Sequence, residues 1–207
     1  YTKYQFVNLY FTYYVQKYII PFGDEMKKLL IINASPRENG VCAEVLKQIK
    51  PYFIDCETKE YNVYKLDPLP CKACGYCEMH NGCANKDLDF FFLDLKEADY
   101  VAILSPMYNN FFPPPLKALM DRFQRFCSAK YLRGDSEPIG KQKSVGLVIT
   151  SGTNARECAN YMSNSVKQLF SPLGGELKAR YYIPGTDLNN YTFNIVELEK
   201  FVHQIKK

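Results

Sequence analysis

Residues 28–42, which read KLLIINASPRENGVC, join an apolar strand to a helix through a polar loop. The branched apolar run at residues 29–32 is typical of a strand that is buried on both faces. The loop ends at Gly40, and apolar residues then recur with helical spacing as far as Pro51. Backbone N–H groups and the helix dipole favour an anion at such a helix N-terminus, and Arg37 can bind a phosphate through two hydrogen bonds. The stretch therefore predicts a phosphate-binding loop.

The rest of the chain alternates between strand patterns and helix patterns. Further strands are predicted at residues 61–66, 100–104, 144–149 and 177–183. Helices are predicted at residues 41–49, 87–96, 116–123, 154–170 and 198–205, and Asn154 with Glu157 forms a capping pattern for the fourth of them. This alternation predicts a flavodoxin-like α/β three-layer sandwich, with five parallel strands in the order 2-1-3-4-5.

Polar loops follow the first, third and fourth predicted strands, at residues 33–40, 105–110 and 150–154. Because the strands are parallel, these loops meet at one edge of the sheet, at the switch point where FMN binds in this fold. The first loop would hold the phosphate, and the other two would contact the flavin ring or stabilise its negative charge when reduced. The candidate cofactor-binding residues are Ser35, Arg37, Asn39, Gly40, Val41, Cys42, Pro106, Met107, Tyr108, Asn109, Ser151, Gly152 and Thr153.

Two features of the first loop allow another interpretation. The loop can be a helix cap that binds no ligand. The thiol of Cys42, at a helix N-terminus where thiol pKa values tend to fall, can be redox-sensitive or can simply pack in the core. The dinucleotide fingerprint G-x-G-x-x-G is absent after the first strand, so one terminal phosphate suits this loop better than a pyrophosphate.

Four of the eight cysteines are grouped with the spacing C-x2-C-x2-C-x5-C. On a helix the first three would point in different directions, whereas a loop that turns at Gly75 and Gly82 can bring the sulfurs together. The spacing favours a [4Fe–4S] cluster, since zinc sites more often use two separated pairs. Free thiols, zinc and a redox disulfide remain alternatives. The candidate metal ligands are Cys71, Cys74, Cys77 and Cys83.

Composition restricts the class of protein. A chain of 207 residues with 47% hydrophobic and 23% charged residues is ordinary for one soluble globular domain. The net charge of +4 is mild and the basic residues are scattered, so neither a nucleic-acid partner nor a membrane is expected. Grouped cysteines in a chain of this length do not resemble a secreted disulfide framework, and they predict a reducing compartment, the cytoplasm.

Residues 1–25 differ from the remainder because they are rich in aromatic side chains. Polar residues interrupt the apolar run, and no signal-peptide cleavage pattern is present, so the segment is a poor membrane span. We expect an N-terminal extension outside a flavodoxin-like domain at residues 26–207. The extension is either an arm that packs on a partner subunit or a segment, expression-derived or from an upstream start, that precedes a natural start at Met26.

Several of these stretches together resemble the NAD(P)H-dependent FMN reductase superfamily, and within it the iron–sulfur flavoprotein branch. They are S-P-R-x-x-G at 35–40, the four-cysteine segment, DYVAILSPMY at 99–108, LKALMDR at 116–122 and TSG at 150–152. The resemblance extends from about residue 26 to the C-terminus. It implies a flavin phosphate at the first loop and an isoalloxazine ring against residues 106–109 and 151–153. It also implies a homodimer or homotetramer, with the helix at 117–122 often in the contact.

The function that the resemblance implies is that of an FMN-dependent NAD(P)H oxidoreductase. A flavin would take a hydride from a nicotinamide and pass electrons to a quinone, a flavin or a protein. The protein would mainly bind and orient its cofactor, so no catalytic acid or base is named. The alternative is an iron–sulfur flavoprotein electron carrier with a [4Fe–4S] cluster at the four grouped cysteines. A third possibility is an FMN-binding regulatory or structural module whose cysteines are inert.

Overall fold

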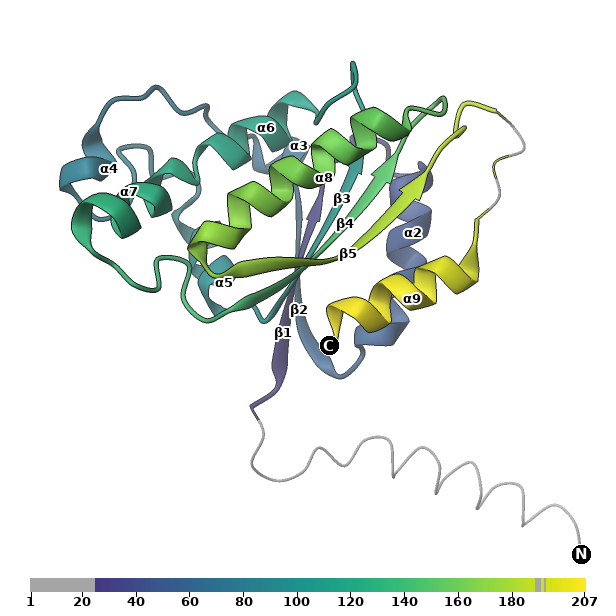
Figure 1. Ribbon diagram of the computed structural model, residues 1–207, viewed down its shortest axis with the longest axis horizontal. Helices are drawn as coiled ribbons and strands as arrows, with labels where there is room; N and C mark the ends of the chain where they lie inside the picture. The colour runs from purple at the N-terminus through teal and green to yellow at the C-terminus, as the bar shows by residue number, and fades with distance from the viewer. Residues whose placement is uncertain (1–24, 189–190, 192) are drawn as a thin grey trace, which may run out of the picture.

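The computed structural model describes residues 25–188, 191 and 193–207. Within these residues, parallel strands form one five-stranded sheet in the order β2-β1-β3-β4-β5 (Figure 1). Both the fold class and the strand order are as predicted. The strands are β1 (Lys27–Asn33), β2 (Cys56–Asn62), β3 (Tyr100–Pro106), β4 (Lys143–Thr150) and β5 (Gly175–Ile183).

Helices cover both faces of this sheet. One face carries α2 (Val41–Ile49) and α9 (Ile195–Ile205), and the other carries α5 (Asp89–Glu97), α6 (Pro114–Asp121), α7 (Gln124–Arg133) and α8 (Arg156–Phe170) (Figure 1). Short elements complete the described chain: η1 (Lys50–Phe53), α3 (Val63–Leu66), α4 (Tyr76–Met79) and η2 (Ser171–Leu173).

The central strands are apolar throughout because both of their faces are buried. Along β1, Leu29 and Ile31 pack against α2 and α9, whereas Leu30 and Ile32 pack in the opposite core. Successive residues of a strand point to opposite faces, so a strand in a middle layer needs apolar side chains at every position. The unbroken apolar run read from the sequence has this cause.

The prediction for the second strand, at residues 61–66, is wrong. The strand is β2, which ends at Asn62, and the chain then turns directly into α3. The side chain of Asn62 caps that helix by accepting a hydrogen bond from the N–H of Tyr64 at 2.9 Å. Among the described residues β2 is an edge strand that pairs with β1 alone, and it is mostly exposed. Its residues are therefore polar and leave no apolar run to detect.

Two helix boundaries also differ from the predictions. In place of one helix at residues 116–123, α6 ends at Asp121 and a separate helix, α7, follows. The residues that α7 buries include Ser128 and Ala129, so its apolar periodicity is weak. Helix α8 begins after Ala155, and Asn154 does not cap it.

The predicted extension at residues 1–25 lies, apart from Glu25, outside the described residues.

No helix in the described part of the chain is both long enough and apolar enough to cross a membrane.

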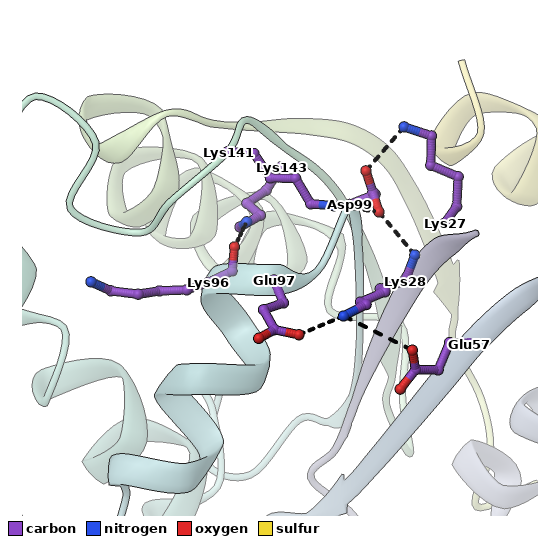
Figure 2. Close-up of polar contacts among 8 residues, drawn as sticks. All are labelled: Lys27, Lys28, Glu57, Lys96, Glu97, Asp99, Lys141 and Lys143. Carbon is purple, nitrogen blue, oxygen red and sulfur yellow. Dashed lines mark hydrogen bonds and ion pairs between the residues drawn. The ribbon is translucent and has the colours of Figure 1, made fainter. Parts of the chain in front are cut away.

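A buried lysine lies at the amino end of the sheet, opposite the polar loops at its carboxyl edge. Lys143 begins β4, is fully buried, and donates from Nζ to the carbonyl of Lys96 at 2.6 Å, at the end of α5 (Figure 2). Beside it, Asp99 accepts hydrogen bonds from Lys27 at 3.1 Å and from Lys141 at 2.9 Å. The Lys143 ammonium thus stabilises the C-terminal end of α5, where the helix dipole favours a positive charge.

This lysine is expected to make stability depend on pH. Burial, with a smaller effect from the charge of Lys141, lowers the pKa of Lys143 from 10.5 to about 8. Between these values the unfolded chain binds more protons, so the stability of the folded state rises with pH. Relative to Lys143→Met, the wild type should gain roughly 1 kcal/mol in free energy of unfolding between about pH 7 and about pH 9. Urea unfolding of both proteins measures this, and parallel pH profiles would contradict it.

Candidate functional site

A cavity of about 470 Å³ opens at the carboxyl edge of the sheet, beside the β1 and β3 ends where the strand order reverses. It is lined by the loops after β1, β3 and β4, as expected, and by the loop after β5. Eleven of the thirteen candidate cofactor-binding residues line it: Ser35, Arg37, Asn39, Gly40, Val41, Cys42, Pro106, Met107, Tyr108, Ser151 and Gly152. The structure therefore brings the three predicted loops together around one space.

The loop after β1 is shaped by hydrogen bonds from its own side chains. The Ser35 hydroxyl accepts a hydrogen bond from the N–H of Arg37 at 3.2 Å, and the Ser35 carbonyl accepts one from the Asn62 side chain at 2.8 Å. Helix α2 then begins after Gly40, whose extended backbone supplies no side-chain cap. No side chain caps this helix, so the N–H groups of its first turn lack a side-chain acceptor. Because the first residues of the helix line the cavity, these N–H groups are available to an anionic ligand.

The loop after β3 is a tight turn. Tyr108 and Phe111 exchange two backbone hydrogen bonds, at 2.9 and 3.0 Å. Between them, Asn109 and Asn110 have φ of 47° and 66°, in the left-handed region that asparagine tolerates better than most residues. The turn carries Asn109 away from the cavity lining, while the N–H of Met107 donates to the Thr150 carbonyl at 2.7 Å and joins this loop to the next.

The loop after β4 is fixed by a tyrosine on β5. The Tyr182 hydroxyl lies 2.8 Å from the Ser151 hydroxyl and accepts a hydrogen bond from the N–H of Ala155 at 2.7 Å. The Ser151 hydroxyl also donates to the Thr153 carbonyl at 2.6 Å, and Thr153 itself is exposed and does not line the cavity. The hydroxyl of Ser151 thus shapes the loop, and its neighbour Gly152 presents backbone to the cavity.

Four lining residues were missed by the sequence analysis: Thr150, Thr186, Asp187 and Tyr191. Three of them follow β5, whose carboxyl end reaches the same edge of the sheet. A Cβ on Gly152 would lie 2.0 Å from Oδ2 of Asp187, so the absence of a side chain at 152 leaves room for that carboxylate. The polar run after Ile183 was the available signal, because it is a fourth loop at the carboxyl edge.

Cys42 does not have the lowered pKa that its helix position suggested. The thiol is buried, and burial raises its pKa to about 11, although a contact with the Thr150 hydroxyl at 3.7 Å acts in the other direction. A thiol with a raised pKa is protonated near neutral pH and is a poor nucleophile. Burial and the raised pKa of Cys42 favour the packing interpretation over the redox-sensitive one.

The four grouped cysteines line a second cavity, of about 500 Å³, between their loop and the region of α6 and α7. Gly75 and Gly82 have φ of 73° and 90°, so both glycines make the turns expected of them. Four thiols around one cavity are the donor set of an iron–sulfur cluster. Within the described residues, however, no three His, Cys, Asp or Glu side chains are grouped closely enough to hold a metal ion. The four thiols are therefore the right ligands for an iron–sulfur cluster, and in this structure they lie farther apart than a bound cluster would hold them.

A doubly wound parallel sheet with an uncapped helix N-terminus and polar loops at its switch point defines a flavodoxin-like protein. The chain belongs to the NADPH-dependent FMN reductase family, whose model matches residues 27–176.

Two curated relatives are similar to this chain in sequence, and a solved structure shares its fold. An iron–sulfur flavoprotein from Archaeoglobus fulgidus is 34% identical over 104 residues, which cover 48% of this chain and 52% of that protein. One from Methanosarcina thermophila is 30% identical over 98 residues, which cover 46% of this chain and 51% of that protein. The chain thus spans about half the length of these two relatives. An NAD(P)H:quinone oxidoreductase from Methanothermobacter marburgensis has the same fold, with a TM-score of 0.65 at 13% identity over 88% of this chain and 96% of that chain.

Proposed function

We propose that this protein is an FMN-dependent oxidoreductase that takes electrons from NADH or NADPH and delivers them to a quinone, a flavin or a protein. Membership of the NADPH-dependent FMN reductase family supports the flavin and the type of reaction. The observation that carries the proposal is the cavity at the switch point, where an uncapped helix N-terminus and Arg37 face the same space as two further loops.

The first loop would hold the FMN phosphate. The candidate donors are the Ser35 hydroxyl, the Arg37 guanidinium and the N–H groups of residues 39–42. The Ser35 oxygen already accepts from the Arg37 N–H at 3.2 Å, so its own proton is left for a phosphate oxygen. Arg37 is exposed at the rim, where its long side chain can close over the phosphate once it enters.

The flavin ring would lie between Pro106, Met107 and Tyr108 on one side and Ser151 and Gly152 on the other. Bound FMN would supply a centre that accepts a hydride and releases electrons singly or in pairs. The chain would orient the ring and exclude water from it. Asp187 lines the same space, and its carboxylate would disfavour negative charge on a cofactor bound there.

Anaerobic reduction tests this function. Purified protein loaded with FMN is mixed with NADPH or with NADH, and the visible absorption of the oxidised flavin is followed. We expect at least one nicotinamide to bleach the bound flavin much faster than it bleaches free FMN, because the cavity would hold both in contact. Bleaching no faster than free FMN by either donor would contradict the reductase. Fast reduction by reduced ferredoxin alone would favour an electron carrier.

The second candidate is an electron carrier in which a [4Fe–4S] cluster works beside the flavin. The specific observation in its favour is that all four grouped cysteines line one cavity. Cys71, Cys74, Cys77 and Cys83 would be its ligands. An iron and sulfide assay on anaerobically purified protein tests it, and yellow protein without iron would remove it.

We further propose that the protein is a cytoplasmic homodimer or homotetramer. All eight cysteines are free, which supports a reducing compartment. Light scattering in solution measures the oligomeric state.

A further inference from the structure

Arg122, directly after α6, is the largest of the fully buried side chains, with 1% of its surface exposed. Its guanidinium pairs with the Asp87 carboxylate, with Nη2 to Oδ1 at 2.9 Å and Nη1 to Oδ2 at 3.2 Å. Burial alone would raise the pKa of Asp87, but the hydrogen bonds from Arg122 and from the Leu69 N–H hold it below the usual value. A buried charge is costly unless it is paired and hydrogen-bonded, so this pair calls for a structural reason.

That reason lies in what else the guanidinium binds. Nη1 donates to the Leu69 carbonyl at 2.8 Å, and Nη2 donates to the Asn85 carbonyl at 2.8 Å. The Asp87 carboxylate belongs to the same hydrogen-bond network, because it accepts a hydrogen bond from the Leu69 N–H at 2.9 Å. All four grouped cysteines lie between residues 69 and 85. The buried side chain of Arg122 therefore binds both ends of the segment that carries the four thiols, at Leu69 and at Asn85.

The middle of this segment is also held in place, by contacts with α7. Arg133, at the end of α7, donates from Nη1 to the Cys77 carbonyl, and the Cys77 sulfur lies 3.5 Å from the Ser128 hydroxyl. Helix α4, which carries Cys77, lies beside α7 at one end of the molecule (Figure 1). The loop is thus held against α7 at its centre and against Arg122 at its two ends, and it lines the cysteine cavity together with Asp121 and Gln124.

One donor of Arg122 is left over. Its Nε is buried and has no hydrogen-bond partner among the described residues. The Cys83 side chain lies close enough to this guanidinium to interact with it. A thiolate or a cluster sulfide is the type of anionic acceptor that a spare N–H can bind, and such bonds tune iron–sulfur centres.

We propose that Arg122 is the positioning residue of the cysteine cavity: it closes residues 69–87 into a loop and keeps one N–H for an anionic sulfur at Cys83 or in a cluster bound there. The second part rests on the electron-carrier candidate above. The first part, the closure of the loop, does not.

The test compares the wild type with Arg122→Lys, which keeps the charge but lacks the planar guanidinium that spans both carbonyls and Asp87. The proteins are reconstituted anaerobically with ferrous iron and sulfide. Iron per chain, FMN per chain and the midpoint potential of the cluster are measured, together with amide hydrogen exchange of residues 69–87. Lys143→Met is the matched control, since it removes a buried cation whose hydrogen bond goes to the Lys96 carbonyl, outside residues 69–87.

We expect Arg122→Lys to bind iron roughly 10- to 100-fold more weakly, as for other residues that orient metal ligands. FMN per chain should stay at the wild-type level, and exchange should rise in residues 69–87. Any iron retained by Arg122→Lys should have a lower midpoint potential, because an N–H bond to sulfur is lost, and a merely structural role would not produce this shift. Lys143→Met should match the wild type in all four measurements.

Each other outcome has a definite meaning. Wild-type iron, potential and exchange in Arg122→Lys would overturn the proposal. If the wild type binds no iron, the carrier candidate fails, and hydrogen exchange alone decides whether Arg122 closes the loop. Loss of FMN together with iron would show that the substitution disturbs the whole fold; Arg122→Met would then be compared with Lys143→Met, and equal losses in both would also overturn the proposal.

Discussion

Gly146→Val is expected to lower the free energy of unfolding by about 2–3 kcal/mol, as overpacking of a core does. Gly146 lies in β4, beneath α9, at a register irregularity between β4 and β5. A Cβ there would come within 2.1 Å of Cδ1 of Ile205 and within 2.8 Å of Cζ of Phe201, both of them buried. Valine would therefore push α9 away from the sheet. Urea unfolding of both proteins measures the loss.

The control for this prediction is a variant that makes room for the new side chain. Ile205→Ala removes the atoms that the valine would meet, so the double variant Gly146→Val with Ile205→Ala should be more stable than the sum of the two single effects predicts. Strictly additive losses would show that α9 does not press on β4 at this glycine.

Arg37→Ala is expected to weaken FMN binding roughly 10- to 100-fold, the effect of losing charge-assisted hydrogen bonds to a phosphate. Riboflavin lacks the phosphate, so its affinity should be the same in the variant and the wild type. Quenching of flavin fluorescence during titration measures both affinities.

Lys65→Ala is the matched control for Arg37→Ala. Lys65 is an exposed cation that pairs with Glu38 of the same loop at 3.2 Å, and removing it should change FMN affinity little. If Arg37→Ala left FMN affinity unchanged, or weakened riboflavin as much as FMN, Arg37 would have no special role toward the phosphate.

The fold could be predicted from the sequence wherever burial imposes a pattern. Strands β1, β3 and β4 are buried on both faces, so their apolar runs were clear, and the polar loops that follow them were found with them. Strand β2 was misplaced because an edge strand exposed along most of its length carries polar residues that resemble a loop. Helix α7 was missed because it buries small and polar side chains.

The candidate site was predicted as far as its loops follow directly from buried strands. Asp187 and Tyr191 were missed because they follow β5, whereas the predicted site comprised only the loops after the first, third and fourth strands. The bond from Arg122 to Leu69 and Asn85 could not be predicted, since residues 53 and 37 positions apart in sequence meet only in the folded chain. The resemblance implied that the helix at 117–122 is often in the subunit contact, and it gave no indication that the Arg122 side chain is fully buried within the chain.

A crystal structure of the protein grown with FMN tests the central proposal, that the cavity at the carboxyl edge is the flavin site. The expected result is one FMN per chain in that cavity. Its phosphate should lie within hydrogen-bonding distance of Ser35, Arg37 and the N–H groups of residues 39–42, and its ring should lie between residues 106–108 and 151–152. FMN bound elsewhere, for example in the cavity lined by the four cysteines, or a cavity left empty at saturating FMN, would contradict it.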